Sequence, residues 1–348
     1  MKEKVLFLSA SILLSVFTLQ LFYTEELSLI SSAEAVPTTV LCEPTGSVHD
    51  ISMQAVKTKQ TDYLYAYQLT SHTMTLDDTI TDVTKMHSKD PTIPGPTIVI
   101  DEGDKVRVTV SNGLNDPSLG IVGVHVHGVA YDIKSDGTLE ETNRDSDQGA
   151  PPAYTVEWVA CKGTAGSWPY HDHTLMGING LEYRGLFGAV IVNPASGEIN
   201  AYDGSSQTNL DVEDLAKDFV VYARDDAFWI QEINYNKNSK QTPLGVNPIL
   251  TAKDGDFVRW NIIPLGNDIH KFYLDNYQWF DEGTTNLISE KDLGPLEHHV
   301  FTIKAKEGSN MYGDDAINLK FKKMFSEFDG TKGDKPSKAG LFAKLKEQ

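Results

Sequence analysis

Four of the ten histidines stand in two pairs, and each pair has one residue between its members. The first pair is His125 and His127, in Val-His-Val-His-Gly, and the second is His171 and His173, in Tyr-His-Asp-His. On a β-strand, residues i and i+2 project from the same face, so each pair would present two imidazoles side by side. Neutral imidazole is a good ligand for copper and zinc. One pair alone would fit two solvated surface histidines equally well, but two pairs in one domain predict a metal site.

The segments that must position these histidines are typical of β-strands. Runs rich in Val, Ile, Thr and Tyr recur at short intervals, with Gly, Asn, Asp and Pro between them, at 97–101, 105–111, 154–159 and 188–192. Segments with a long helical period are scarce. This pattern is typical of antiparallel sandwiches, and we predict an all-β fold.

The N-terminus is typical of an export signal. Lys2 and Lys4 form a short basic region, residues 5–21 are a nearly unbroken apolar run, and residues 33–35 are a small-x-small cleavage pattern. An uncleaved membrane anchor is the alternative, because the run approaches the length needed to span a bilayer. In both cases we expect the bulk of the chain outside the cytoplasm, either secreted, periplasmic or at the cell surface. The net charge of −19 argues against nucleic acid as a partner.

A weak internal repeat predicts two copies of one sandwich. Residues 96–108 and 248–260 share the pattern of apolar strand, Gly-Asp turn and second strand. The expected organisation is a signal peptide at 1–35, a first sandwich at 36–195, a second at 196–328 and a Lys-rich flexible tail at 329–348. Within that tail a short helix is expected at 340–347.

The two cysteines, Cys42 and Cys161, have two interpretations. In an exported chain they can form a disulfide that ties the mature N-terminus to the first domain. Alternatively one of them is a thiolate ligand for copper. We favour the disulfide, because neither cysteine stands next to a histidine.

The ordered motifs of the first half resemble the multicopper oxidases, in particular their ceruloplasmin-like branch. The resemblance rests on Pro-Gly-Pro-Thr at 94–97, Gly-Val-His-Val-His-Gly-Val-Ala-Tyr at 123–131, Ser-Asp-Gly-Thr at 135–138, Trp-Pro-Tyr-His-Asp-His at 168–173 and Gly-Leu-Phe-Gly-Ala-Val-Ile-Val at 185–192. It implies two tandem cupredoxin-like Greek-key sandwiches. It also implies that His125 faces a type 2 copper and that His127, His171 and His173 face a type 3 pair. Two-domain members commonly complete their copper cluster by trimerising.

The second half departs from the family pattern. Where a His-x-Phe-His-x-His-Gly motif is expected, His270 survives, but Tyr273 and Asp275 replace the next two histidines. Further on, Asp314 stands where the family has its cysteine, and Asp315 stands where it has a histidine. A type 1 copper needs a cysteine thiolate, so we expect that centre to be absent. His270, Asp275 and Asp315 could form a weaker metal site, although ordinary surface aspartates are the simpler interpretation.

The remaining candidates are weaker. Three histidines are isolated in the sequence and are expected to be structural or solvated: His49, His72 and His87. His298 and His299 are expected in a loop, and as neighbours they cannot chelate one ion together. The acidic segment 135–147 would bind calcium if it follows the ceruloplasmin-like branch, and otherwise is a solvated loop.

Three functions follow from these patterns. The first is a multicopper-oxidase-like oxidoreductase that uses copper to pass electrons from a small-molecule or metal-ion substrate to oxygen or a small nitrogen oxide. The second is a non-catalytic copper protein for storage, delivery or assembly, and the third is a structural relic. The expected assembly is a homotrimer, or a hetero-oligomer with a copper-competent partner. A membrane partner is expected only if the N-terminal segment stays uncleaved.

Overall fold

The fold is described from a computed structural model. The described residues are 42–58, 64–114, 122–138, 153–174, 180–224, 228–246, 248–266, 269–274, 276–306, 310–315 and 341–346. The predicted signal peptide, 1–35, lies outside them. Within the described part of the chain, no helix is long and apolar enough to cross a membrane.

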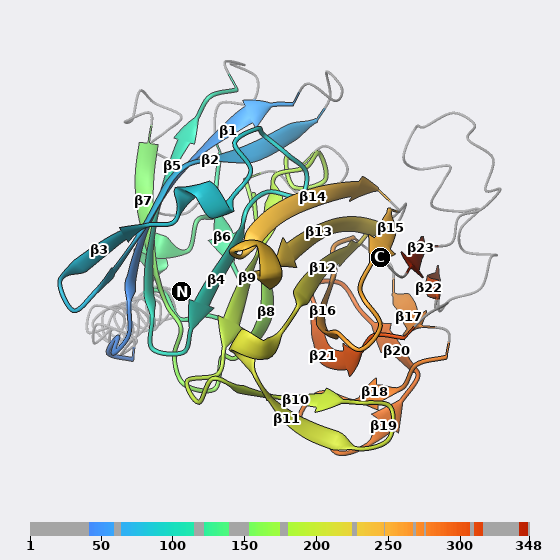
Figure 1. Cartoon of the computed structure of the whole chain (residues 1–348). Helices are drawn as coiled ribbons and strands as arrows, with labels where there is room; N and C mark the ends of the chain where they lie inside the picture. Colours follow the sequence, from blue (N-terminus) through green and yellow to red (C-terminus); the bar gives the residue numbers. More distant parts are fainter. Residues whose placement is uncertain are drawn as a thin grey trace, which may run out of the picture. The chain divides into compact units, whose positions relative to one another are not determined.

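Two sheets enclose the first core (Figure 1). The larger sheet has the order β3-β2-β1-β5-β7, with bounds Thr79–Asp82, Tyr65–Leu76, Val48–Lys57, Lys105–Asn112 and Ala153–Val159. The smaller sheet has the order β4-β9-β8-β6, with bounds Thr97–Asp101, Phe187–Asn193, Gly166–His171 and His125–Val126. Burial alternates along β1 and β5, because every second side chain faces the opposing sheet. Both sheets contribute to one apolar cluster that includes Val108, Trp158 and Val190.

The second core has a similar construction. Its larger sheet has the order β11-β10-β21-β16-β12-β13-β14, with bounds Gln207–Asp211, Glu198–Tyr202, His299–Lys304, Phe257–Pro264, Lys217–Ala223, Phe228–Asn234 and Lys240–Val246. The facing sheet has the order β15-β23-β22-β17-β20, with bounds Ile249–Thr251, Leu341–Lys346, Asn310–Asp315, His270–Leu274 and Glu290–Leu293. A separate pair joins β18 (Trp279–Phe280) to β19 (Leu287–Ile288). The described helical elements are short 3-10 turns: η1 (Thr84–Met86), η3 (Ile133–Ser135), η5 (Val212–Asp214) and η6 (Tyr235–Lys237). The all-β prediction is confirmed.

The two sandwiches share an apolar interface. Every residue of β9 is buried, because its two faces serve different cores. Val190 and Val192 pack into the first core, whereas Phe187, Ala189 and Ile191 join a cluster with residues of the second sandwich. A continuous apolar run is the pattern expected of a strand covered on both faces.

The C-terminal segment differs from the expectation of a flexible tail with a short helix. Leu341–Lys346 form β23, which pairs antiparallel with β22 and parallel with β15. A helix of this length is marginal alone, whereas a strand gains backbone hydrogen bonds from two neighbours. The rest of the predicted tail lies outside the described residues.

Candidate metal centre

Strand pairing brings the two histidine pairs together. β6 and β8 are antiparallel neighbours, and His125 is the Cα partner of His171. Val124 and Val126 are buried in the first core, so the alternation of the chain turns His125 and His127 to the opposite face. The amide N–H of His127 donates to the carbonyl of Pro169 at 3.0 Å, which extends the contact beyond the short strand.

All four imidazoles lie in one cluster. The ring centroid of His125 is 4.9 Å from that of His127, 5.7 Å from that of His171 and 5.2 Å from that of His173. The rings of His127 and His171 are stacked with their centroids 5.3 Å apart, and their Nε2 atoms are 3.1 Å apart. The sequence predicted that these four side chains converge, and the structure places them so.

Backbone carbonyls orient two of the rings. Nδ1 of His125 lies 2.7 Å from the carbonyl oxygen of Asp136, and Nδ1 of His171 lies 2.9 Å from that of Asp172. A carbonyl can only accept, so each Nδ1 carries the proton and donates it. Each Nε2 therefore keeps its lone pair, which is how metal-ligating histidines are usually held.

Burial favours the neutral form of three of the four rings. Desolvation lowers the pKa of His171 to about 3 and that of His127 to about 4, and it also lowers the pKa of His125. The positive field of the other rings acts in the same direction on His127 and His171. Neutral imidazole is the form that binds a metal, so protons compete with the metal only in acid.

Asp172 connects the two histidine pairs through hydrogen bonds. Its carboxylate is buried and accepts hydrogen bonds from the amide of Gly123 at 2.7 Å and from the hydroxyl of Thr174 at 2.7 Å. Gly123 leads into the first histidine pair, so this contact ties that segment to the second pair. Burial raises the pKa of Asp172 to about 6, against the opposing effect of the hydrogen bonds it accepts.

Gly128 permits the close approach behind the first pair. Its φ is +72°, and a Cβ at this position would lie 1.8 Å from Cδ2 of Trp168. The indole N–H of Trp168 donates to the carbonyl of Thr164 at 2.8 Å, which holds the ring in place. Only glycine combines this backbone conformation with the contact.

The donor set fits copper in part. Two nitrogens 3.1 Å apart can both reach an ion at the usual metal–imidazole distance of about 2.0–2.1 Å, with an angle of about 100° at the ion. Imidazole donors suit copper and zinc. Among the described residues, however, no three His, Cys, Asp or Glu side chains are already gathered around a single point. The cluster is thus one facing pair, His127 and His171, with His125 and His173 beside it.

The predicted weaker site in the second sandwich is only partly described. His270 is buried at the start of β17, and its Cα partner on β22 is Asp315. The side chain of Asp315 and the whole of Asp275 lie outside the described residues. Asp314, at the position of the family's cysteine, is paired with Lys271.

Other predicted residues have definite places. Cys42 and Cys161 are joined by a disulfide, so neither offers a thiolate to a metal.

His299 was expected in a loop, but it is the first residue of β21. Its Nε2 accepts a hydrogen bond from the indole N–H of Trp279 at 2.8 Å. His298 contacts the ring of Trp168, and Nδ1 of His298 and Nδ1 of His299 each lie 3.7 Å from the same carboxylate oxygen of Glu282. Of the acidic segment 135–147, residues 139–147 lie outside the described part.

Sequence reasoning missed the arrangement of His49, His72 and His87. They are not isolated but form one buried hydrogen-bonded chain. Pairing of β1 with β2 brings the first two together, and η1 carries the third. Nothing in their spacing along the sequence indicates this contact.

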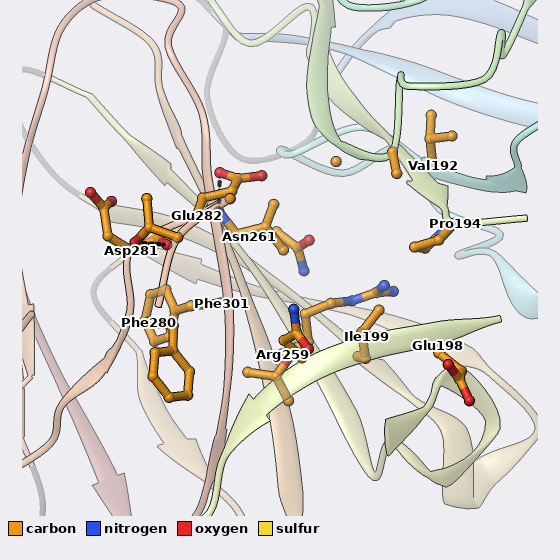
Figure 2. A pocket seen from close by; sticks show the side chains of 17 residues that line it. Val192, Pro194, Glu198, Ile199, Arg259, Asn261, Phe280, Asp281, Glu282 and Phe301 are labelled. Atoms are coloured by element: carbon orange, nitrogen blue, oxygen red, sulfur yellow. Dashed lines mark hydrogen bonds between the residues drawn. The ribbon is translucent and has the colours of Figure 1, made fainter. Parts of the chain in front are cut away.

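A pocket of about 410 Å³ lies between the sandwiches (Figure 2). Gly166 at the start of β8 borders it, together with Arg259, Asn261 and Glu282 of the second sandwich. Burial raises the pKa of Glu282 to about 7, although it accepts a hydrogen bond from the amide of Val300. The described lining includes none of the four clustered histidines. His171 stands five residues further along β8, about 17 Å away on an extended strand.

The fold and the histidine cluster define a protein of the cupredoxin type. Residues 68–197 match the family model for multicopper oxidase. The first sandwich therefore matches a multicopper oxidase domain over these residues, and the predicted resemblance to the multicopper oxidases is confirmed at that level. Homologues in this family bind copper, which agrees with the metal predicted from the histidines.

Individual relatives match parts of the chain. It is 31% identical over 230 residues to a "probable nitrite reductase-hydroxylamine oxidoreductase fusion protein" of Kuenenia stuttgartiensis, covering 63% of this chain and 24% of that protein. It is 29% identical to copper resistance protein A of Escherichia coli, covering 39% of this chain and 21% of that protein. The chain thus spans about a quarter or less of these relatives. The solved copper nitrite reductase of Nitrosomonas europaea has a similar fold, with a TM-score of 0.50, 14% identity and coverage of 86% of this chain and 94% of that one.

Proposed function

We propose that this chain is an exported, copper-dependent oxidoreductase in which His125, His127, His171 and His173 hold the metal. The observation that carries the proposal is the meeting of the two His-x-His pairs across β6 and β8. The match of residues 68–197 to the multicopper oxidases supports copper as the ion. Bound copper supplies one-electron redox chemistry at this cluster.

The chain's own residues prepare that site. His127 and His171 bring their Nε2 atoms within 3.1 Å of each other. The carbonyls of Asp136 and Asp172 keep His125 and His171, respectively, in the tautomer that leaves Nε2 free to ligate. The carboxyl of Asp172 binds a proton near pH 6, two residues or fewer from both members of the second pair. Burial lowers the pKa values of His127 and His171, which keeps these two imidazoles neutral at neutral pH.

A copper-holding role without turnover is the second candidate, and the second sandwich favours it. A type 1 centre takes a cysteine thiolate, but position 314 is Asp, and the only two cysteines of the sequence are bonded to each other. Electrons therefore cannot enter by that route within one chain. An oxidoreductase built on this cluster needs another donor path or a partner subunit that supplies it.

Copper loading with turnover assays separates the candidates. Copper is added to the purified exported protein, and copper per chain, visible absorption and oxygen or nitrite consumption are measured with phenolic and ferrous donors. Bound copper with consumption supports the oxidoreductase. Bound copper without consumption identifies the holding role, and absence of specific copper refutes both. Native mass of the same sample distinguishes a homotrimer from a chain that needs a copper-competent partner.

Paired variants test the ligand assignment. The double substitution of His171→Ala and His173→Ala should abolish specific copper binding. His298→Gln is the matched control, because this histidine lies in the second sandwich and contacts the ring of Trp168 instead of the cluster. Equal copper content in the double variant and the control would count against the assignment.

A further inference from the structure

Three buried histidines form a continuous hydrogen-bonded chain away from the copper cluster. Nδ1 of His49 is 3.0 Å from Nε2 of His72, and Nδ1 of His72 is 2.8 Å from Nε2 of His87. At one end, Nε2 of His49 is 3.2 Å from a carboxylate oxygen of Asp104. At the other, Nδ1 of His87 is 3.2 Å from the side-chain oxygen of Gln241. This series of hydrogen bonds therefore begins in the first sandwich, at Asp104, and ends in the second, at Gln241 on β14.

Water has little access to this chain. His49 and His72 are each 4% exposed, and His87 is 6% exposed. A nitrogen that lacks a partner within the chain cannot replace it with solvent, and an unsatisfied buried polar group costs about 1–3 kcal/mol. All four contacts of the chain should therefore be real hydrogen bonds, each containing one proton.

Both ends of the chain are acceptors. Asp104 also accepts from the amides of Ser47 at 2.6 Å and Asp101 at 2.8 Å, so each of its two carboxyl oxygens accepts a backbone N–H. Gln241 is fixed in orientation by Thr97, because its oxygen accepts from the Thr97 amide at 3.0 Å and its NH₂ donates to the Thr97 carbonyl. A flipped amide would lose both of these bonds. The side-chain oxygen of Gln241 therefore faces His87 and can only accept.

A count of protons then decides the charge state. The chain has four hydrogen bonds, from Asp104 through three imidazoles to Gln241, and each needs one N–H. Three neutral imidazoles carry three N–H groups in total, because each has one donor and one acceptor nitrogen. One bond would then place two acceptors opposite each other. Four N–H groups are present only when one of the three rings is an imidazolium.

The surrounding charges favour His49 as the charged ring. The carboxylate of Asp104 is its direct partner, and both side chains are buried. Burial lowers the pKa of His72 to about 3 and that of His87 to about 4, so these two rings stay neutral. Asp82 also faces His72.

The remaining facing groups add little charge near His49. Lys85 interacts electrostatically with Asp82, which faces His72. At the His87 end, β14 and β13 contribute the neutral side chains of Gln241 and Gln231. Asp101, beside Asp104, directs its own carboxylate to the amide of Asn193.

We infer that the chain from Asp104 through His49, His72 and His87 to Gln241 is a proton-binding site that holds one imidazolium at neutral pH and fastens the two sandwiches together through it. With the imidazolium at His49, each of the four bonds contains one N–H donor. Loss of the proton removes one bond of the chain. The contact between the sandwiches is then complete below the pKa of the bound proton and weakened above it.

Nitrogen chemical shifts of the ring atoms test the inference directly. The purified full protein is labelled with ¹⁵N in its histidines, and long-range ¹H–¹⁵N spectra are recorded from pH 6 to pH 9, with ascorbate to keep any copper reduced and diamagnetic. One ring, identified by its loss in His49→Gln, should keep two protonated nitrogens at pH 8, about 1.5 pH units above the ordinary pKa of histidine. Three neutral rings at pH 7 would overturn the inference.

Two glutamine variants provide a matched comparison. Gln241→Met removes the terminal acceptor, so three neutral rings then satisfy all remaining bonds, and the titration midpoint should fall by at least about one pH unit. Gln231→Met is the control, because Gln231 is equally buried and bonds to Thr97 and Gln241 but to no histidine. Gln231→Met should leave the titration midpoint within a few tenths of a pH unit of the wild-type value. Equal shifts in both variants would refute the proton count.

Discussion

Asp172 allows a sharp test of how burial acts at the histidine cluster. Its pKa is raised by desolvation to about 6, whereas an unfolded Asp titrates near 3.9. Between these values the folded protein holds a proton that the unfolded chain has released. Folding stability therefore falls as pH rises through this window, because the folded state binds more protons. Above the window the folded protein contains a buried, ionised carboxylate.

The substitution Asp172→Asn removes this dependence while keeping the shape of the side chain. At about 1.4 kcal/mol per pH unit, a window of about two units corresponds to about 3 kcal/mol. About half of that falls between pH 5 and pH 7.5. The difference in unfolding free energy, wild type minus variant, should thus decrease by about 1.4 kcal/mol as pH rises from 5 to 7.5. Subtracting the variant cancels every other titrating group.

Urea unfolding of the copper-free protein, followed by tryptophan fluorescence at several pH values, measures this difference. Asp203→Asn is the control. Asp203 is exposed and also accepts several hydrogen bonds, but these lower its pKa to about 2, so neither its folded nor its unfolded pKa lies between pH 5 and pH 7.5. The difference in unfolding free energy between wild type and Asp203→Asn should therefore not change with pH. A flat difference for Asp172→Asn as well would refute the argument that burial dominates at this carboxyl.

Three further outcomes are expected. Asp218→Asn should lower the unfolding free energy by about 3 kcal/mol or more, measured by urea unfolding, because it leaves the guanidinium of Arg259 buried without its two-point carboxylate partner. Copper affinity, measured by competition with a chelator of known pH dependence, should be nearly constant from pH 8 to pH 5 and decrease below that, as His127 and His171 protonate with pKa values of about 4 and 3. Gly128→Ala should lower the melting temperature and the copper content together, because its methyl group would overlap the neighbouring indole ring; a variant with both unchanged would contradict the packing described.

Short-range patterns predicted the histidine cluster because its geometry is local to two strands. The spacing of His125 and His127 fixes their common face, and the alternation with buried valines fixes which face it is. The missing cysteine at position 314 is likewise visible in the sequence alone. What could not be predicted is how the strands combine.

Long-range pairing decides the features that the sequence did not reveal. His49 and His72 meet through the register of β1 and β2, which includes a shift between Ser52 and Met53 that no local pattern indicates. The carbonyls that orient the cluster belong to the backbone, so they leave no signature in residue type. Residues 341–346 become a strand only because β22 and β15 provide two open edges for pairing.

The double burial of β9 shows what the second sandwich does for the first. Phe187, Ala189 and Ile191 occupy the outer face of the strand that supports β8, and they are covered by side chains such as Tyr222 and Ile263. Without the second sandwich, the first sandwich would expose this apolar face to water next to the strand that carries His171. The second sandwich thus keeps this apolar face of the first out of water, whatever chemistry its own residues perform.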